Sequence, residues 1–227
     1  MAETKKEVDM NEVDEKKQIV SPTVTHMKRI PPGQVITHKF PVYDIAPRPV
    51  FNQEKWRFVV GGEVKQQRTL TWAEFLSLPK VEVLADFHCV TRWSKQNMLW
   101  EGVSTKTIYD LVEPNPQAKY LMIHCMEGYT ANLPLEDFLR EDCLFAYNLN
   151  GKPLEPEHGF PLRLVIPQLY AWKSAKYVCG VEFMLEDKPG YWELRGYHIH
   201  GDPWLEERFW EEDMKAWEIR RKAKENK

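Results

Sequence analysis

Apolar positions along the chain recur in short runs, and several of these runs alternate with polar positions, as is typical of half-buried β-strands. The run VEVLADFHC over residues 81–89 is a clear example, and it places Cys89 at the end of a strand. Asn150-Gly151 follows another such run and favours a hairpin turn. The other strands that the pattern predicts lie at residues 56–60, 119–126, 144–149, 162–166 and 175–185.

The helices that the sequence predicts are short. Thr71 and Glu74 in the segment TWAE fit a capping box that begins a helix, and Pro79 ends it. Residues 104–112 predict a second helix, and a third is expected to begin near Pro134. Because short helices are interspersed with irregularly spaced strands, the pattern predicts an α+β fold of mixed sheets rather than a doubly wound parallel sheet.

The two ends of the chain differ from the middle. Residues 1–25 are charged and poor in aromatic side chains, so we expect a mobile leader there. Residues 26–205 are expected to form one domain, which opens with an irregular segment rich in Pro and Gly. Residues 206–227 are charged, and Trp210 and Trp217 give them an apolar stripe that predicts a helical tail.

Composition narrows the functional classes. The 227 residues carry 31 basic and 34 acidic side chains, and this near balance gives no reason to expect a nucleic-acid partner. No apolar run approaches the roughly 18–20 residues that cross a bilayer. The N-terminal segment has no signal-peptide core and no twin-arginine pair, so a cytoplasmic location is the default expectation. The four widely spaced cysteines include no CxxC pair, which argues against a structural zinc site and a disulfide framework.

Cys89 is the first candidate for chemistry. In the segment ADFHCVTRWSK it is followed closely by Arg92 and Lys95. Nearby cations lower the pKa of a thiol and favour the thiolate, which is both a metal ligand and a nucleophile. The local sequence leaves three interpretations open for Cys89: a buried structural cysteine, a catalytic nucleophile, and a ligand to a soft metal.

A second group of candidates lies in the segments HGFPLR and SAK. Arg163 begins an apolar strand, where a buried charge requires an anionic partner, and Lys176 raises the same question. Arginine suits forked contact with a phosphate, and lysine neutralises one as a point charge. The alternative is that both cations pair with internal carboxylates or reach solvent. The glycine-rich nucleotide motifs GxGxxG and GxxxxGK[ST] are absent from the sequence.

Two weaker candidates complete the set. The triplet Thr37-His38-Lys39 is polar between apolar neighbours, and a solvated loop is its simpler interpretation. Cys125 follows His124 on a predicted strand, where neighbouring side chains point to opposite faces, so the two do not form a catalytic dyad. A buried structural cysteine is the simpler interpretation of Cys125.

The segments PPGQ–THKFPV, DFHCVTRWS, HGFPLRLVIP and WKSAKYV, in this order between about Ile30 and Trp204, resemble the molybdenum-binding domain of the sulfite oxidase family. Its small prokaryotic members are the most similar. The resemblance implies that Cys89 ligates one molybdenum beside one molybdopterin, and that Arg92 is the remaining candidate for a catalytic arginine. The residues that it implies bind the cofactor are Thr37, His38, Lys39, Cys125, His158, Arg163, Ser174, Ala175 and Lys176.

The resemblance also implies a reaction. A molybdopterin-dependent oxidoreductase of this kind transfers an oxygen atom to or from a small substrate, either a sulfite-like oxyanion or an S- or N-oxide. Because the sequence has no CxxCH haem motif and no cysteine cluster for iron–sulfur, electrons would be exchanged with a separate partner. Two other classes stay open: an enzyme that uses Cys89 as a nucleophile without metal, and a non-catalytic molybdopterin-binding protein.

One further segment is left with two interpretations. The stretch GYHIHGDPW over residues 196–204 is rich in His, Tyr and Trp. It either lines the mouth of the substrate site or closes the C-terminal side of the domain by packing.

Overall fold

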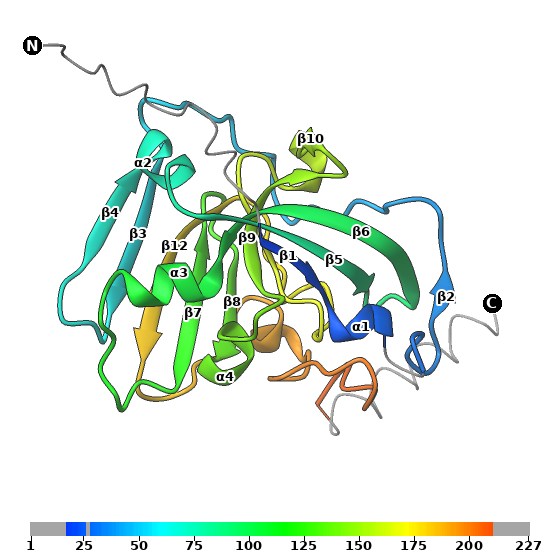
Figure 1. Cartoon of the computed structure of the whole chain (residues 1–227). Coiled ribbons are helices and arrows are strands. Elements are labelled where there is room, and N and C mark those ends of the chain that lie inside the picture. The colour runs from blue at the N-terminus through cyan, green and yellow to red at the C-terminus, as the bar shows by residue number, and fades with distance from the viewer. Residues whose placement is uncertain (1–16, 26–27, 211–227) are drawn as a thin grey trace, which may run out of the picture.

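The computed structural model describes residues 17–25 and 28–210, and two mixed β-sheets dominate it (Figure 1). The helices are few-residue elements, so the predicted α+β class is confirmed. Three α-helices follow strands directly: α2 (Trp72–Leu76), α3 (Thr105–Asp110) and α4 (Leu135–Phe138). The remaining helical elements are α1 (Pro22–Thr25) and the 3-10 helices η1 (Pro156–His158) and η2 (Glu193–Arg195).

The larger sheet carries the loop that contains Cys89. Its seven strands run in the order β1-β5-β6-β9-β10, with β11 paired to β9 and β2 paired to β6. The long antiparallel pair of β5 and β6 forms its centre, and residues 89–92 join the two strands. The strands are β1 (Lys17–Val20), β2 (Val35–Ile36), β5 (Lys80–His88), β6 (Trp93–Ser104), β9 (Leu144–Leu149), β10 (Lys152–Pro153) and β11 (Arg163–Val165).

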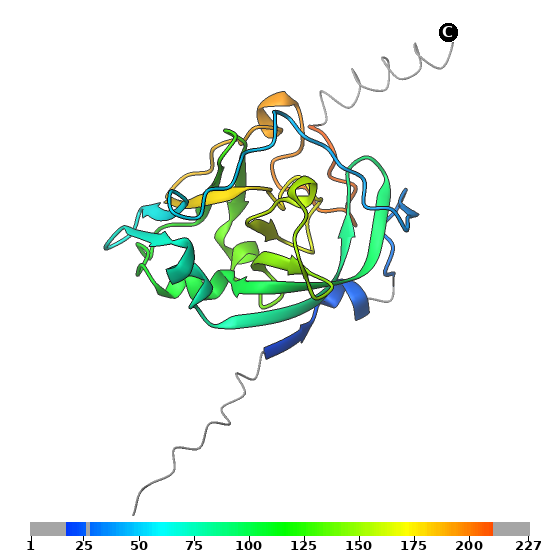
Figure 2. The same cartoon turned by 90° about the horizontal axis from the view of Figure 1, so that it is seen from above.

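The second sheet has five strands in the order β4-β3-β12-β7-β8. Its central strand β12 pairs parallel with β3 and antiparallel with β7. The irregular segment between β2 and β3 crosses from the first sheet to the second, as the turned view makes plain (Figure 2). The strands are β3 (Arg57–Gly62), β4 (Arg68–Thr71), β7 (Tyr120–Cys125), β8 (Thr130–Pro134) and β12 (Val178–Met184).

The apolar side chains form two cores, one on each face of the larger sheet. The first core joins both sheets through residues such as Phe58, Phe145 and Phe183. The second includes Phe87, Trp100 and Cys89. Side chains alternate between faces along a strand, so neighbouring residues of β9 contribute to different cores. Cys89 therefore lies beside a packed aromatic layer rather than in a free loop.

The capping box of α2 is present as predicted. The Thr71 hydroxyl accepts a hydrogen bond from the Glu74 amide at 3.3 Å, and the Glu74 carboxylate accepts one from the Thr71 amide at 2.7 Å. The hairpin at Asn150-Gly151 is also confirmed, because β9 and β10 pair antiparallel across it. Strand β6, by contrast, was not predicted. Its polar stretch at residues 95–97 interrupts the apolar alternation, yet backbone pairing with β5 and β9 holds the strand in place.

The expected mobile leader is wrong for residues 17–25. Strand β1 pairs in parallel with β5, from Lys17 opposite Val81 to Val20 opposite Leu84. Ser21 is fully buried, and its hydroxyl donates to the Asp142 carboxylate at 2.6 Å. An edge strand is held by backbone hydrogen bonds, so its polar composition did not reveal it. Residues 1–16 of the predicted leader lie outside the described residues.

The boundary of the predicted helical tail is also wrong. Residues 206–210 are not helical, and Phe209 forms a β-bridge with Tyr197. Arg208 is buried with 5% of its surface exposed, so this stretch packs on the domain. Residues 211–227 of the tail lie outside the described residues. None of the helices in the described part of the chain has the length and apolar character needed to cross a bilayer.

Candidate active site around Cys89

A cavity of about 670 Å³ opens beside the loop that joins β5 and β6. Its wall brings together segments that are far apart in the sequence, including residues 40–46, 89–91 and 174–177. Six of the residues that the sequence singled out line it: Cys89, His158, Arg163, Ser174, Ala175 and Lys176. A concave site of this size, lined mainly by apolar side chains with a few convergent polar groups, suits a cofactor or a small molecule.

The fold presents the Cys89 thiol to this cavity from a tight loop. The Cys89 amide donates to the Trp93 carbonyl at 2.9 Å, and the Arg92 amide donates back to the Cys89 carbonyl at 3.0 Å. Arg92 has a positive φ of 75°, so the chain reverses within four residues. The thiol Sγ accepts a hydrogen bond from the Thr91 hydroxyl at 3.2 Å.

The electrostatics of Cys89 differ from the sequence-based expectation. Burial raises the pKa of the thiol above its usual value, although the hydrogen bond from Thr91 and the charges of Arg163 and Arg208 oppose this rise. The two cations that follow Cys89 in sequence do not surround the sulfur: Arg92 has an exposed side chain, and Lys95 donates to the His38 carbonyl at 2.7 Å. A thiol of this kind loses its proton when a metal ion binds it.

Arg163 is the clearest sign that the cavity holds an anion. Its guanidinium donates to the His158 carbonyl at 3.0 Å and packs on the ring of Phe87 at 4.8 Å, and its Nε has no partner. Burial lowers its pKa to about 10. Across residues 17–25 and 28–210, no carboxylate forms an ion pair with it. A buried cation without a counter-charge is costly, so the site fits an anionic group such as a phosphate.

Lys176 behaves differently. Its ammonium pairs with the Asp44 carboxylate and also donates to the Glu157 carbonyl at 3.1 Å. Asp44 also binds Arg48 at 2.9 Å, and its pKa is lowered because the two cations outweigh its partial burial. The alternative of an internal carboxylate partner therefore holds for Lys176. The cation still lines the cavity, where it can redistribute its contacts toward a phosphate.

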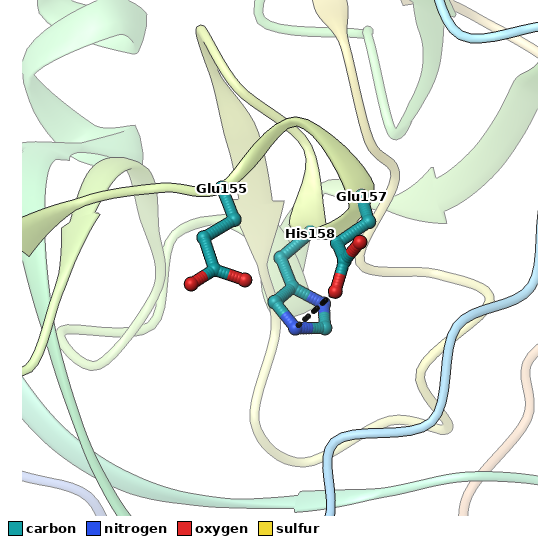
Figure 3. A group of neighbouring side chains, drawn as sticks. All are labelled: Glu155, Glu157 and His158. Carbon is teal, nitrogen blue, oxygen red and sulfur yellow. Dashed lines mark ion pairs between the residues drawn. The ribbon is translucent and has the colours of Figure 1, made fainter.

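His158 sits at the edge of the cavity at the end of η1. Its ring stacks on Phe40, with centroids 4.1 Å apart, and its pKa is lowered, first by burial and then by the charge of Arg163. The ring lies between the carboxylates of Glu155 and Glu157, and potential ligand atoms of the three residues fall within 4.8 Å of one another (Figure 3). The Glu155 carboxylate is exposed to solvent, and the Glu157 carboxylate forms an ion pair with Arg48, so both carboxylates are stabilised without a metal ion.

The turn at residues 171–177 forms part of the cavity wall, and its Lys176 lies against the Glu157–Gly159 segment. The Ser174 hydroxyl accepts a hydrogen bond from the Ile166 amide at 2.9 Å, and the Ala175 carbonyl accepts one from the Leu164 amide at 2.9 Å. Gly159 has a φ of 114°, and a Cβ there would lie 3.3 Å from Lys176 and 3.2 Å from Arg163. The glycine thus lets the two cation-bearing segments approach each other closely.

Five residues that the resemblance implicated do not line the cavity: Thr37, His38, Lys39, Arg92 and Cys125. The Thr37 amide donates to the Ser94 carbonyl at 2.9 Å, so the triplet continues along the edge of β6, and its neighbour Phe40 enters the site instead. Cys125 is buried in the core that joins both sheets. Direct cofactor contact by these five residues therefore has no support from the geometry.

The sequence analysis did not single out several polar groups of the cavity, among them Glu127, and it indicated Tyr197 only as part of the stretch 196–204. Glu127 lies in the β7–β8 turn, its Oε2 has no hydrogen-bond partner, and burial raises its pKa to about 7. Tyr197 packs on Trp172 and Trp192, and burial with the nearby Cys89 raises its pKa. The stretch from residue 196 thus both reaches the cavity and packs. Only its content of His, Tyr and Trp signalled this.

Three known proteins that are similar in sequence to this chain are named as oxidoreductases or reductase subunits. Residues 45–192 match the family model described as the oxidoreductase molybdopterin binding domain. The oxidoreductase YuiH of Bacillus subtilis is 45% identical over 182 residues, which cover 80% of this chain and 92% of the relative. The catalytic subunit MsrP of the protein-methionine-sulfoxide reductase of Campylobacter jejuni is 26% identical, over 63% of this chain and 54% of the relative. A putative protein-methionine-sulfoxide reductase subunit of Azospira oryzae, YedZ1, is 30% identical, over 75% and 66%.

The fold has a relative of known structure. The crystal structure of the sulfane dehydrogenase SoxCD from Paracoccus pantotrophus superposes with a TM-score of 0.57 at 20% identity, over 61% of this chain and 40% of that chain. At this identity the match concerns the fold alone, and it confirms a sheet arrangement of the sulfite oxidase type.

The chemistry of the residues that line the cavity fits the cofactor of this family. It offers one cysteine sulfur, a soft ligand that suits molybdenum, and a buried arginine that has no carboxylate partner in the described residues. The family model covers most of the domain, and YuiH aligns over nearly its whole length. This chain therefore belongs to the sulfite oxidase-like family of molybdopterin-binding oxidoreductases, and its cofactor is molybdenum–molybdopterin.

Proposed function

We propose that this oxidoreductase removes an oxygen atom from a small, uncharged S-oxide. The observation that carries the proposal is the charge of the cavity wall. Among the described residues that line it, the Lys and Arg side chains are Arg163 and Lys176, both of which we assign to the cofactor, and the acidic groups are Asp44, Glu127 and Glu157. A sulfite-like oxyanion would meet no unassigned cation among these described lining residues, and above about pH 7 it would face the ionised Glu127 carboxylate, whose like charge disfavours it.

The remaining wall is aromatic. The aromatic lining residues outside the group that we assign to the cofactor include Tyr43, Trp172, Tyr191, Trp192 and Tyr197. Sulfur groups pack favourably against aromatic rings, which supports an S-oxide over a hydrated anion. One relative is named as the catalytic subunit, and another as a putative subunit, of a protein-methionine-sulfoxide reductase, and these names support an S-oxide as substrate class.

Each residue then has a defined role. Cys89 supplies the sulfur that ligates molybdenum, while Arg163, Lys176, His158 and the turn at residues 174–175 hold the pterin and its phosphate. When bound by these residues, the cofactor would supply the two-electron oxygen-atom-transfer chemistry. The complete reaction consumes one S-oxide, two electrons and two protons and yields a thioether and water. The electrons come from a separate donor molecule. A cytoplasmic location stays a prediction.

The two other classes raised by the sequence lose support. A nucleophilic cysteine requires a neighbouring base, but in the described part of the chain the hydrogen-bond partners of the Cys89 sulfur come from Thr91, which is not a base, and burial raises the pKa of the thiol. A purely non-catalytic molybdopterin carrier is disfavoured because the relatives are oxidoreductases and the cavity has wall area beyond the cofactor residues.

The substrate prediction is tested by steady-state kinetics of the purified holoenzyme. Methyl sulfoxides should be reduced with a reduced viologen dye as electron donor. Sulfite should be oxidised, with ferricyanide as acceptor, at a kcat/KM at least about 100-fold lower, because of like-charge repulsion at the wall. A comparable or higher kcat/KM for sulfite would overturn the assignment.

Glu127 supplies the proton in this proposal. Its carboxyl faces the cavity, and burial, assisted by Asp44 and opposed by Lys176, raises its pKa to about 7. The acid is therefore protonated below about pH 7 and ionised above it, which matches the need of a reductase for a proton donor near neutrality. The titratable and charged groups that face it are Lys176, Asp44, Tyr177, Cys125, Tyr129 and Cys179.

The turnover of the parent enzyme should thus fall as the pH rises through about 7. Glu127→Gln cannot donate a proton, so we expect kcat at pH 6 to drop roughly 100-fold and its dependence on pH near 7 to disappear. The measurement is kcat for S-oxide reduction between pH 5 and 9, with Glu155→Gln, an exposed carboxylate outside the cavity wall, as the control. A Glu127→Gln profile parallel to that of the parent would contradict the role.

A further inference from the structure

Arg208 reaches from the last described stretch of the chain to the loop that holds Cys89. One guanidinium nitrogen donates to the Val90 carbonyl at 2.5 Å, and a second donates to the Pro32 carbonyl at 3.3 Å. The guanidinium lies over the ring of Tyr170, 4.9 Å from its centroid. A single buried side chain therefore ties together three segments that are remote in sequence.

The Val90 carbonyl is the point of the loop at which Arg208 acts. The carbonyl of Cys89 is already used, because it accepts hydrogen bonds from the Arg92 amide and from the Gln34 side chain at 3.0 Å each. With Arg208 bound to the next carbonyl, both peptide planes that flank the Cα of Val90 are fixed. Removing this bond would free the Val90–Thr91 peptide, the second peptide after the sulfur-bearing residue.

Arg208 also brings a positive charge close to the sulfur. Its guanidinium is within hydrogen-bond distance of the carbonyl of Val90, the residue next to Cys89, whereas Arg163 lines the same cavity as the sulfur. Arg163 has an assigned anionic partner in the cofactor. In the described part of the chain the carboxylate that pairs with Arg208 is Glu206 at 3.5 Å, and because Glu206 is half exposed, solvent weakens the pair and leaves the arginine charge largely uncancelled at the loop.

We propose that Arg208 is a positioning residue, which fixes the Cys89 loop through the Val90 carbonyl and places a positive charge beside the metal-ligating sulfur. The proposal rests on the role of Cys89 as the ligand, but it does not depend on which substrate is reduced. Without Arg208 the Val90 carbonyl would lose its hydrogen bond from the guanidinium, while the loop would keep its internal hydrogen bonds and those with Gln34, the Val35 amide and Tyr43.

Two variants separate the hydrogen bonds from the charge. Arg208→Lys keeps the charge but loses the fork that spans two carbonyls, and Arg208→Gln loses the charge as well. Arg140→Gln, an exposed arginine outside the cavity wall, is the matched control. The first measurement is amide hydrogen exchange of residues 89–93 in the full-length, cofactor-free chain, which requires neither metal nor activity.

Exchange at the Cys89 and Arg92 amides should become roughly tenfold to hundredfold faster in both Arg208 variants, since a hydrogen bond from a charged group is lost. The second measurement is a redox titration of molybdenum in the holoenzyme, followed by electron paramagnetic resonance. Arg208→Gln should shift the midpoint potential to a lower value, because a nearby positive charge stabilises the reduced state. Arg208→Lys should stay close to the parent.

Unchanged exchange at residues 89–93 in both variants would overturn the positioning role, and Arg208→Lys decides this even where Arg208→Gln fails to fold. If Arg208→Gln and the parent have the same molybdenum midpoint potential, the proposed electrostatic role of Arg208 is refuted. A chain that binds no molybdenum would refute the assignment of Cys89, yet would leave the exchange result as a separate test of the loop.

Discussion

The variant Cys89→Ser should lose S-oxide reductase activity by more than about 100-fold. Mutating residues that merely support a metal ligand typically costs 10- to 100-fold, so removal of the ligand itself should cost more. A serine hydroxyl is a harder and far less acidic ligand than a thiol, and it suits molybdenum poorly beside sulfur donors. The measurement is kcat/KM of the holoenzyme with a reduced viologen dye, together with the molybdenum content per chain.

Cys179→Ser is the matched control for this variant. Cys179 is half-buried on β12, donates to the His124 carbonyl at 3.5 Å and does not line the cavity. Its replacement should leave turnover within a factor of about two, as expected for a substitution away from the site. Parent-like activity in Cys89→Ser would refute the ligand assignment. A loss in both variants would point to a general sensitivity of the fold to cysteine replacement.

Local patterns predicted the elements in which each residue's environment follows from its neighbours in sequence. The β-branched run before Cys89 forms β5, and the capping box at Thr71 begins α2. Strand β1 could not be found in this way, because its stability comes from backbone pairing with a strand more than sixty residues away.

The site shows the same division. The sequence alone identified Cys89, Arg163 and Lys176, because a reactive or charged side chain beside an apolar strand is unusual and suggests a specific partner. Glu127 and Arg208 carry no such local mark, since a charged residue in a turn or near a chain end is usually solvated. They acquire their roles only when tertiary folding brings the turn to the cavity and the chain end to the Val90 carbonyl.

Arg163→Met should have opposite effects on cofactor binding and on the stability of the cofactor-free chain. The variant lacks the cation that we assign to the phosphate, so molybdopterin should be lost on purification. In the cofactor-free chain, however, Arg163 is buried without a carboxylate partner in the described residues. Removing an uncompensated charge outweighs the loss of its packing on Phe87, which is worth about 2 kcal/mol, so the melting temperature should rise.

Lys173→Met is the control for Arg163→Met, because it removes a buried cation that does have a carboxylate partner. Lys173 is equally buried, but its ammonium lies 2.5 Å from the Glu193 carboxylate and also donates to Asn132 and to the Ile199 carbonyl. Its removal leaves Glu193 as a buried unpaired charge, which should lower the free energy of unfolding by about 3–5 kcal/mol. Calorimetry of both cofactor-free variants measures the contrast. If Arg163→Met melts as low as Lys173→Met, then Arg163 belongs to the fold rather than to the cofactor site.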